Sequence, residues 1–209
     1  MRFESRKGAG RLLADRLKKY GKDCLVLAIP RGGVVIGAEI ARALSCTLDV
    51  IIIRKLGAPG NPELAIGATT SRGGKVLDQK LIDKLQATSE YVNSELEKQI
   101  LEAKRRESLY TKEKKLDLLG KTVILVDDGI ATGATVEAAI HAVREEAPTK
   151  VILAIPVAPS QTVERLRIQV DELVVLSTPE QFWAIGEFYD DFPQVSDEEV
   201  LKILQETSK

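Results

Sequence analysis

The chain has little cysteine, little histidine and few aromatic residues, and it has no excess of charge of either sign. Its 209 residues include two cysteines, one histidine and 4% aromatics, and its 30 basic and 31 acidic side chains give a net charge of -1. A protein that binds nucleic acid normally carries a clear cationic surplus. The composition therefore predicts no nucleic-acid partner.

The scarce cysteines and histidine also exclude common structural and metal sites. Cys24 and Cys46 are too few for a disulfide framework, and together with His141 they do not form a zinc site of familiar spacing. We interpret both thiols as small buried apolar groups. His141 has Glu137 and Glu145 four residues away on either side of a predicted helix, so we expect it to pair on the surface.

Long hydrophobic runs are missing as well. The first seven residues run directly into charged side chains, and no apolar stretch approaches the roughly 20 residues that a membrane span needs. Apolar residues at 44% and charged residues at 29% are typical of a globular protein. We therefore expect a single domain over residues 1–209, in the cytoplasm and without a membrane partner.

Apolar runs of strand length alternate with helical patterns along most of the chain. The predicted strands are 24–29, 48–53, 122–126, 150–155 and 172–176, and the predicted helices are 8–20, 34–44, 133–146 and 160–169. Continuous apolarity indicates strands covered on both faces, as in a parallel sheet. This order predicts an α/β fold with an open, mostly parallel sheet flanked by helices and a core at about 24–176.

Two segments interrupt this alternation. Residues 54–78 are rich in glycine and proline, which indicates a long loop or a small β-excursion. Residues 88–117 have a helical pattern with balanced charges, which favours an exposed helix with salt bridges, while a partner-binding helix is the alternative.

The carboxyl-terminal segment 177–209 gathers aromatic side chains. Phe182, Trp183 and Phe188 lie close together, either as a stacking platform for a ligand or as a satellite core. Ser196 and Glu199 have the spacing of a capping box, which predicts a last short helix.

The chemistry is concentrated where strand 122–126 ends. Asp127, Asp128 and Gly129 follow the strand, and a small-residue loop then leads into a helix; the loop is Ala131, Thr132, Gly133, Ala134 and Thr135. Small residues at a helix start let backbone N–H groups converge on one phosphate. The two carboxylates would repel a phosphate but suit hydroxyl groups or hydrated Mg²⁺. The pattern therefore predicts a site for a sugar phosphate whose diol faces the carboxylates.

Residues 123–135 resemble the phosphoribosyl pyrophosphate (PRPP) binding signature of the type I phosphoribosyltransferases. No G-x-G-x-x-G follows the first strand and no lysine precedes Thr135, so the dinucleotide fingerprint and the classical phosphate loop both fit worse. The segment 29–33 lies where this family has its pyrophosphate loop. Gly32 and Gly33 would present backbone N–H groups there and Arg31 a forked donor, although a plain strand-to-helix turn is the alternative.

The resemblance extends to other segments. Arg54 and Lys55 look like the Arg-Lys pair of adenine and orotate phosphoribosyltransferases, which serves the pyrophosphate end; two solvated surface cations are the alternative. Residues 56–77 fall where the family carries a flexible lid, and 177–209 where it builds a hood over the acceptor. Glu63 in the lid is a candidate for proton handling, or simply an exposed carboxylate.

The resemblance implies Mg²⁺-dependent transfer of a 5-phosphoribosyl group from PRPP to a nitrogenous, nucleobase-like acceptor, with release of pyrophosphate. Asp127 and Asp128 would hold the ribose hydroxyls, with Asp128 also contacting the metal through water. Phe182 and Trp183 would meet the acceptor, and the family implies a homodimer.

One departure from the pattern limits the choice of acceptor. Enzymes for 6-oxopurines usually have an acidic residue at the position of Ala131, so the sequence disfavours hypoxanthine and guanine. The tail resembles that of a broad bacterial group of phosphoribosyltransferases without an assigned acceptor. A PRPP- or nucleotide-sensing module without turnover is the alternative, but the chain keeps all three motifs, which favours an enzyme.

Overall fold

Five parallel strands form the central sheet, in the order β2-β1-β6-β7-β8. The computed structural model describes residues 1–110 and 117–207. The strands are β1 (Cys24–Ala28), β2 (Thr47–Val50), β6 (Thr122–Val126), β7 (Lys150–Val157) and β8 (Glu172–Ser177). The open parallel sheet predicted from the sequence is confirmed.

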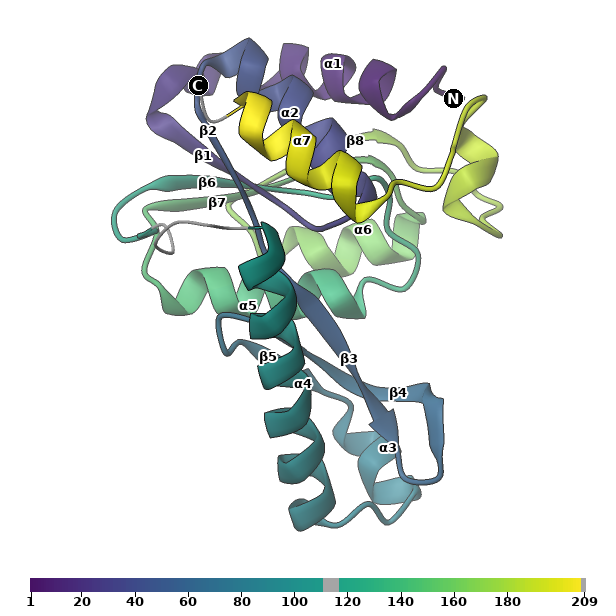
Figure 1. Ribbon diagram of the computed structural model, residues 1–209. Helices are drawn as coiled ribbons and strands as arrows, with labels where there is room; N and C mark the ends of the chain where they lie inside the picture. Colours follow the sequence, from purple (N-terminus) through teal and green to yellow (C-terminus); the bar gives the residue numbers. More distant parts are fainter. Residues whose placement is uncertain (111–116, 208–209) are drawn as a thin grey trace.

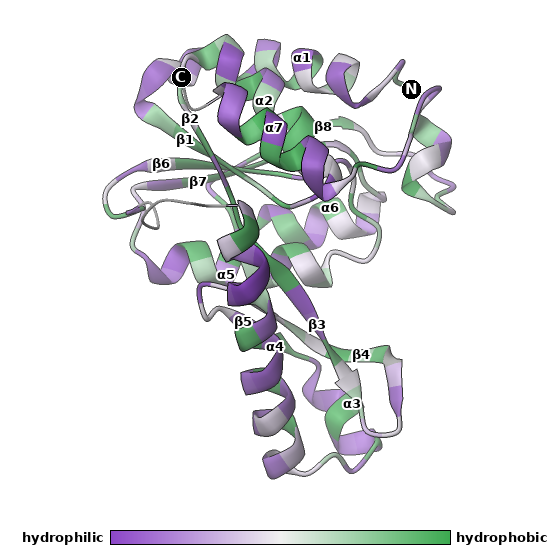
Figure 2. Cartoon of the chain, viewed as in Figure 1, coloured by the Kyte–Doolittle hydropathy of each residue, from purple (hydrophilic) through white to green (hydrophobic). Residues whose placement is uncertain are grey.

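Helices cover both faces of this sheet (Figure 1). One face packs against α1 (Arg6–Leu17), α2 (Gly32–Leu44) and α7 (Asp197–Thr207), and the other against α5 (Ala134–Glu145) and α6 (Ser160–Arg167). Neighbouring residues of a strand point to opposite faces, so Val26 joins the first core and Leu27 the second. This is why the strands read as continuous apolar runs, and Figure 2 shows the hydrophobic sheet between the helices.

The interrupting segments form an arm, which we define as residues 53–110. It consists of β3 (Ile53–Ala58), β4 (Asn61–Thr70) and β5 (Lys75–Leu77) in an antiparallel sheet, with α3 (Gln79–Lys84) and α4 (Ser89–Tyr110). Figure 1 shows the arm extending away from the central sheet. Of the two interpretations of 54–78, the β-excursion is correct, and the predicted strand 48–53 is divided between β2 and β3.

The arm has its own apolar cluster and a polar outer face. Leu56, Ile66 and Ile82 are buried in this cluster, and Val92 of α4 packs with them. On α4, Glu102 pairs with Arg105 at 2.7 Å and with Arg106 at 3.0 Å, which confirms the predicted salt-bridged face. The last part of the predicted helix 88–117, residues 111–116, lies outside the described residues.

The base of the arm is docked on the central domain. The Arg72 side chain is 1% exposed and lies 2.9 Å from the Glu146 carboxylate and 3.5 Å from the Asp49 carboxylate. A Cβ on Gly74 would lie 2.3 Å from the Ala142 Cβ, so only glycine allows this approach. Burial raises the pKa of Asp49, because the loss of water outweighs the nearby Arg72 charge.

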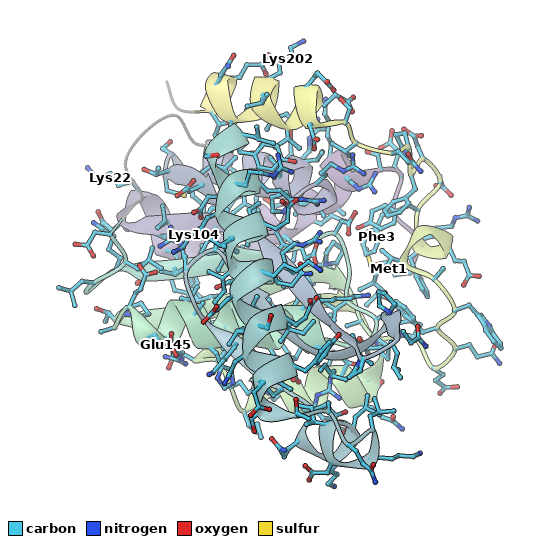
Figure 3. All side chains as sticks on the ribbon, turned by 60° about the horizontal axis from the view of Figure 1, so that its bottom comes forward. Met1, Phe3, Lys22, Lys104, Glu145 and Lys202 are labelled. Atoms are coloured by element: carbon cyan, nitrogen blue, oxygen red, sulfur yellow. The ribbon has the colours of Figure 1, made fainter. Side chains whose placement is uncertain are left out.

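Aromatic side chains of the carboxyl-terminal segment pack mostly with each other. Phe182 stacks on Phe188 with ring centroids 5.2 Å apart, Tyr189 on Phe192 at 4.8 Å, and Phe3 tilts against Tyr189 at 5.4 Å. Figure 3 shows Phe3 beside the carboxyl-terminal segment. The part of this segment that precedes α7, residues 177–195, is called the hood below. It contains a 3₁₀ turn, η2 (Ile185–Phe188). These rings are continuous with the hydrophobic core on the α1, α2 and α7 face of the sheet and do not form a separate satellite core, whereas Trp183 is 83% exposed.

Three local predictions can be compared with the structure. The Ser196 amide donates to the Glu199 carboxylate at 2.8 Å and the Glu199 amide to the Ser196 hydroxyl at 3.2 Å, so the capping box is confirmed. His141 is exposed as expected, but Glu137 pairs with Arg165, and among the described contacts His141 forms an ion pair with neither Glu137 nor Glu145. The predicted helix 8–20 ends at Leu17, where the 3₁₀ helix η1 (Lys18–Asp23) follows.

Within residues 1–110 and 117–207, none of the helices has the length and apolarity needed to cross a membrane. The two cysteines are free thiols, with Cys24 buried and Cys46 half-buried.

Candidate functional site

The carboxyl ends of β1 and β6 bring two of the predicted motifs together. Ala28 and Val126 are register partners at the ends of these parallel strands, so the loops that follow them lie side by side. A Cβ on Gly32 would lie 1.9 Å from Asp128 Oδ2, and a Cβ on Gly33 would lie 3.0 Å from Asp127 Cα. The absence of side chains at the two glycines therefore allows the loop of residues 29–33, the Arg31 loop, to approach the carboxylates closely.

Arg6 contacts the carboxylate pair, which the sequence analysis did not predict. Its Nε lies 2.7 Å from Asp128 Oδ2, and the two side chains are only 10% and 13% exposed. Arg6 Nη1 donates to the Pro193 carbonyl at 2.7 Å, and the guanidinium lies 3.6 Å from the Phe192 ring centroid. No motif surrounds Arg6 in the sequence, so only the tertiary fold reveals this contact.

Asp127 has a different environment from Asp128. Its Oδ1 accepts a hydrogen bond from the Asp128 amide at 2.8 Å. Burial and then the adjacent Asp128 charge raise the pKa of Asp127 well above its ordinary value. The Asp128 carboxylate is thus neutralised by Arg6. The charged form of Asp127 is disfavoured by burial and by Asp128, and a bound hydroxyl group or cation would stabilise it.

The small-residue loop has free backbone donors. Ile130 N donates to Val157 O at 3.0 Å before the loop, and Glu137 N donates to Gly133 O at 2.9 Å after it. Between these two bonds, the N–H groups of residues 131–135 have no hydrogen-bond acceptor within the described part of the chain. Ala131, Thr132 and Ala134 are exposed. The donors at the start of α5 are therefore available to an anion.

Arg31 lies at the entrance to this site. It is exposed, and its Nη1 lies 4.0 Å from Asp197 Oδ1 at the start of α7. Tyr110, the last residue of α4, donates a hydrogen bond to the same Asp197 oxygen. Burial and this carboxylate raise the pKa of Tyr110 to about 12, so the phenol keeps its proton.

The remaining predicted residues are spread over the arm and the hood. Arg54 is half-buried and its Nε donates to Gln99 Oε1 at 2.9 Å, while Lys55 is exposed. Among the described contacts, neither residue touches the carboxylate pair. Glu63 lies in β4, with a side chain outside the part that the structure describes. Phe182 packs against the core on the α1, α2 and α7 face, and Trp183 faces solvent.

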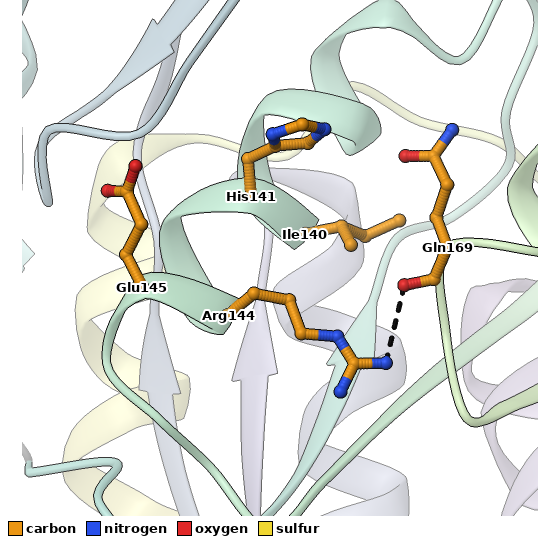
Figure 4. Close-up of a pocket in the computed structure, with 5 residues that line it drawn as sticks. All are labelled: Ile140, His141, Arg144, Glu145 and Gln169. Atoms are coloured by element: carbon orange, nitrogen blue, oxygen red, sulfur yellow. Dashed lines mark hydrogen bonds between the residues drawn. The ribbon is translucent and has the colours of Figure 1, made fainter.

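A separate cavity of about 420 Å³ lies on the outer face of α5. It is lined by Ile140, His141, Arg144, Glu145 and Gln169, and Arg144 donates to the Gln169 carbonyl at 3.3 Å (Figure 4). None of the predicted site residues lines it. The predicted sugar-phosphate site, made up of residues 31–33, 127–128 and 131–135, shares no residue with this cavity.

The chain is similar to known proteins over most of its length. The family described as "Phosphoribosyl transferase domain" matches residues 4–193. A Mycobacterium tuberculosis protein with a provisional phosphoribosyl transferase name is 41% identical over 204 residues, which cover 97% of this chain and 46% of that protein. The chain thus spans about half the length of the curated relatives it matches.

Solved structures share the fold. The crystal structure of TT1426 from Thermus thermophilus is 44% identical, covers 99% of each chain and has a TM-score of 0.85. A hypoxanthine-guanine phosphoribosyltransferase from Bacillus anthracis has a TM-score of 0.50 at 15% identity, over 87% of this chain and 83% of that one. The second likeness shows the fold alone.

Proposed function

Because the chain belongs to the phosphoribosyl transferase domain family, we propose that it transfers the 5-phosphoribosyl group of PRPP to a small nitrogenous acceptor and releases pyrophosphate. The observation that carries this proposal is the open row of N–H groups at 131–135, next to the carboxylates of Asp127 and Asp128. A sugar phosphate needs these two sets of groups at one place. The N–H groups of residues 131–135, which form a cradle, would bind the 5′-phosphate. The carboxylates would accept hydrogen bonds from the ribose hydroxyls.

The Arg31 loop would bind the leaving group. Displacement at the anomeric carbon develops positive charge on the ribose and negative charge on departing pyrophosphate, so catalysis requires donors that are already in place. Arg31 is exposed and its planar fork suits two phosphate oxygens. Gly32 and Gly33 lie close against the carboxylates, so a leaving group bound by this loop would lie beside the ribose.

The residues present fit a magnesium ion that arrives with the substrate. Among the described residues, no group of three or more acidic, histidine or cysteine side chains forms a cage for a metal. Asp127, whose pKa is raised by burial and by Asp128, would hold hydrated Mg²⁺ together with Asp128 through water. When bound, the ion would supply positive charge to the pyrophosphate oxygens.

The hood and the arm would complete the site. The hood lies against the start of the segment that leads into the small-residue loop, because a Cβ on Gly129 would lie 2.6 Å from Ile185 Cγ2. Exposed Trp183 offers an unused ring to an aromatic acceptor, and Ala131 offers no acidic group to a 6-oxopurine. Closure of the arm would bring Arg54, Lys55 and Glu63 toward pyrophosphate and exclude water, which competes as nucleophile.

The assembly and the location of the protein are proposed on the resemblance alone, as a homodimer in the cytoplasm.

Pyrophosphate release tests the proposed function. The protein is incubated with Mg²⁺-PRPP and a panel of nucleobases and other nitrogenous acceptors, and pyrophosphate is followed by a coupled assay. Release that depends on one class of acceptor supports the proposal. Tight binding of PRPP without release under any acceptor would favour the sensing module instead.

A further inference from the structure

The small-residue loop 131–135, called the phosphate loop below, accepts hydrogen bonds from the neighbouring helix α6. Thr162 Oγ1 donates to the Ala131 carbonyl at 2.9 Å, and Arg165 Nη2 donates to the Thr132 carbonyl. Thr162 is 6% exposed, so its hydroxyl is committed to this contact. Two consecutive carbonyls of the loop thus point toward one face of α6.

The direction of these carbonyls fixes the direction of the loop's N–H groups. Among the described residues, the only cis peptide is the one between Pro30 and Arg31, so the peptides that follow Ala131 and Thr132 are trans. In a trans peptide the C=O and N–H bonds point in opposite directions. The N–H groups of Thr132 and Gly133 therefore point away from α6, to the side where no residue of the described chain accepts from them.

Gly133 provides separate evidence that the loop packs tightly against α6. It has a φ of +83°, and a Cβ there would lie 2.9 Å from Arg165 Nη2 and 3.0 Å from Thr162 Cγ2. Arg165 is in turn fixed by Glu137 of α5, with Nε 2.6 Å from Oε1. The guanidinium thus connects the first turn of α5, the loop and α6.

We propose that Thr162 and Arg165 are positioning residues that aim the amides of the phosphate loop at the 5′-phosphate, with Glu137 orienting Arg165. This inference rests on the proposed function, because it assigns the orientation of that same site. Neither side chain needs to touch the ligand, since the bonds to Ala131 and Thr132 occupy the groups that face the loop.

A direct role of Arg165 in binding phosphate makes the opposite prediction for one variant. If Arg165 bound the ligand itself, Glu137→Gln would remove a competing carboxylate and strengthen binding. If Arg165 positions the loop, Glu137→Gln loosens the guanidinium and weakens binding. The sign of this change separates the two roles.

The experiment measures the affinity for ribose 5-phosphate by calorimetry and the PRPP kinetics of the same variants. We expect Arg165→Met to weaken ribose 5-phosphate binding by about 10-fold or more, and Thr162→Val by about 3- to 10-fold, as for a lost charged and a lost neutral hydrogen bond. Arg165→Lys should restore little, because a lysine cannot donate to Thr132 and Glu137 with a planar fork. Since the 5′-phosphate keeps its charge during the reaction, KM should rise while kcat changes less.

Arg167→Met is the matched control, because Arg167 is exposed on the same helix. The inference is overturned if Arg165→Met and Thr162→Val bind ribose 5-phosphate like the wild type, or if Glu137→Gln binds it more tightly. Wild-type protein that binds neither ribose 5-phosphate nor PRPP would instead contradict the proposed function. Thermal unfolding of each variant checks that it remains folded at the assay temperature.

Discussion

Arg6 and Asp128 are 122 residues apart in sequence, and their side chains meet at 2.7 Å in a nearly buried ion pair. The same guanidinium packs on Phe192 and donates to the Pro193 carbonyl, while the Tyr189 hydroxyl donates to the Asp128 carbonyl at 2.6 Å. The start of α1 therefore contacts the Asp128 carboxylate through Arg6, and the hood is held by the Arg6 guanidinium and by the Asp128 backbone carbonyl. This arrangement couples the stability of the hood to the geometry of the residues that we propose to bind ribose.

Arg6→Met should destabilise the protein strongly, because it leaves the Asp128 carboxylate buried without its cation. Removal of one partner of a buried ion pair costs about 3–5 kcal/mol. Urea unfolding at neutral pH measures the change. Arg2→Met is the control, since the Arg2–Asp190 pair is more than half exposed and should contribute less than about 1 kcal/mol. Equal effects of the two substitutions would contradict the structural role of Arg6.

Asp127→Asn should stabilise the metal-free protein at neutral pH. The pKa of Asp127 is raised in the folded state, so the wild type loses stability as pH rises from the unfolded-state pKa through the folded-state pKa. Asparagine cannot ionise and avoids this loss. Thermal unfolding with a chelator present should show a higher midpoint for the variant at pH 7, and no difference below about pH 3, where both forms are neutral. A less stable variant at pH 7 would show that the charged carboxylate supports the fold.

Gly32→Ala should damage the site by steric conflict, because the new Cβ would lie 1.9 Å from Asp128 Oδ2. Overpacking of this kind typically costs about 1–3 kcal/mol and displaces the neighbour, so PRPP affinity should fall along with stability. Gly8→Ala is the control, since its nearest contact would be an ordinary 3.7 Å and helix propensity favours alanine. Calorimetric titration with PRPP measures both variants. Undiminished affinity in Gly32→Ala would mean that the Arg31 loop is not close to the carboxylates in solution.

Arg31→Ala should lower kcat more than it raises KM, because the charge on pyrophosphate grows in the transition state. A charge-assisted hydrogen bond of about 1.5–3 kcal/mol corresponds to a loss of about 10- to 150-fold in turnover. Thr135→Ala should instead raise KM, since it removes a hydroxyl from the cradle for the 5′-phosphate. Steady-state kinetics with the active acceptor separate the two patterns. A pure KM effect of Arg31→Ala would place this residue outside the leaving-group site.

The sequence was sufficient for the parts of the site that lie within short segments. The strand, the two carboxylates and the small-residue loop are consecutive, so their spacing alone predicted residues 122–135 as strand, loop and helix. The family resemblance placed the glycines at 32 and 33 in the loop after the first strand, and the parallel register of β1 and β6 brings that loop beside the carboxylates. The continuous apolar runs also predicted the two-sided sheet.

Contacts between distant segments could not be predicted in this way. Arg6 lies in a helix whose pattern is an ordinary mixture of charged and apolar residues, and nothing there marks a buried guanidinium. Glycine and proline at 54–78 suggested a loop as readily as strands, because antiparallel pairing of β3 and β4 depends on residues up to 17 positions apart, such as Ile53 and Thr70. The bonds from α6 to the phosphate loop likewise exist only in the tertiary structure.

The most direct test of the central claim compares PRPP with inorganic phosphate on wild-type protein and Asp127→Asn. Asp127 is the better choice for this comparison, because Asp128 is also needed to neutralise buried Arg6. If the cradle binds the 5′-phosphate and the carboxylates bind the ribose, Asp127→Asn should lose at least about 10-fold in affinity for Mg²⁺-PRPP. The same variant should bind inorganic phosphate as the wild type does. Equal loss for both ligands, or no loss for PRPP, would contradict the claim that this site holds a phosphoribosyl group.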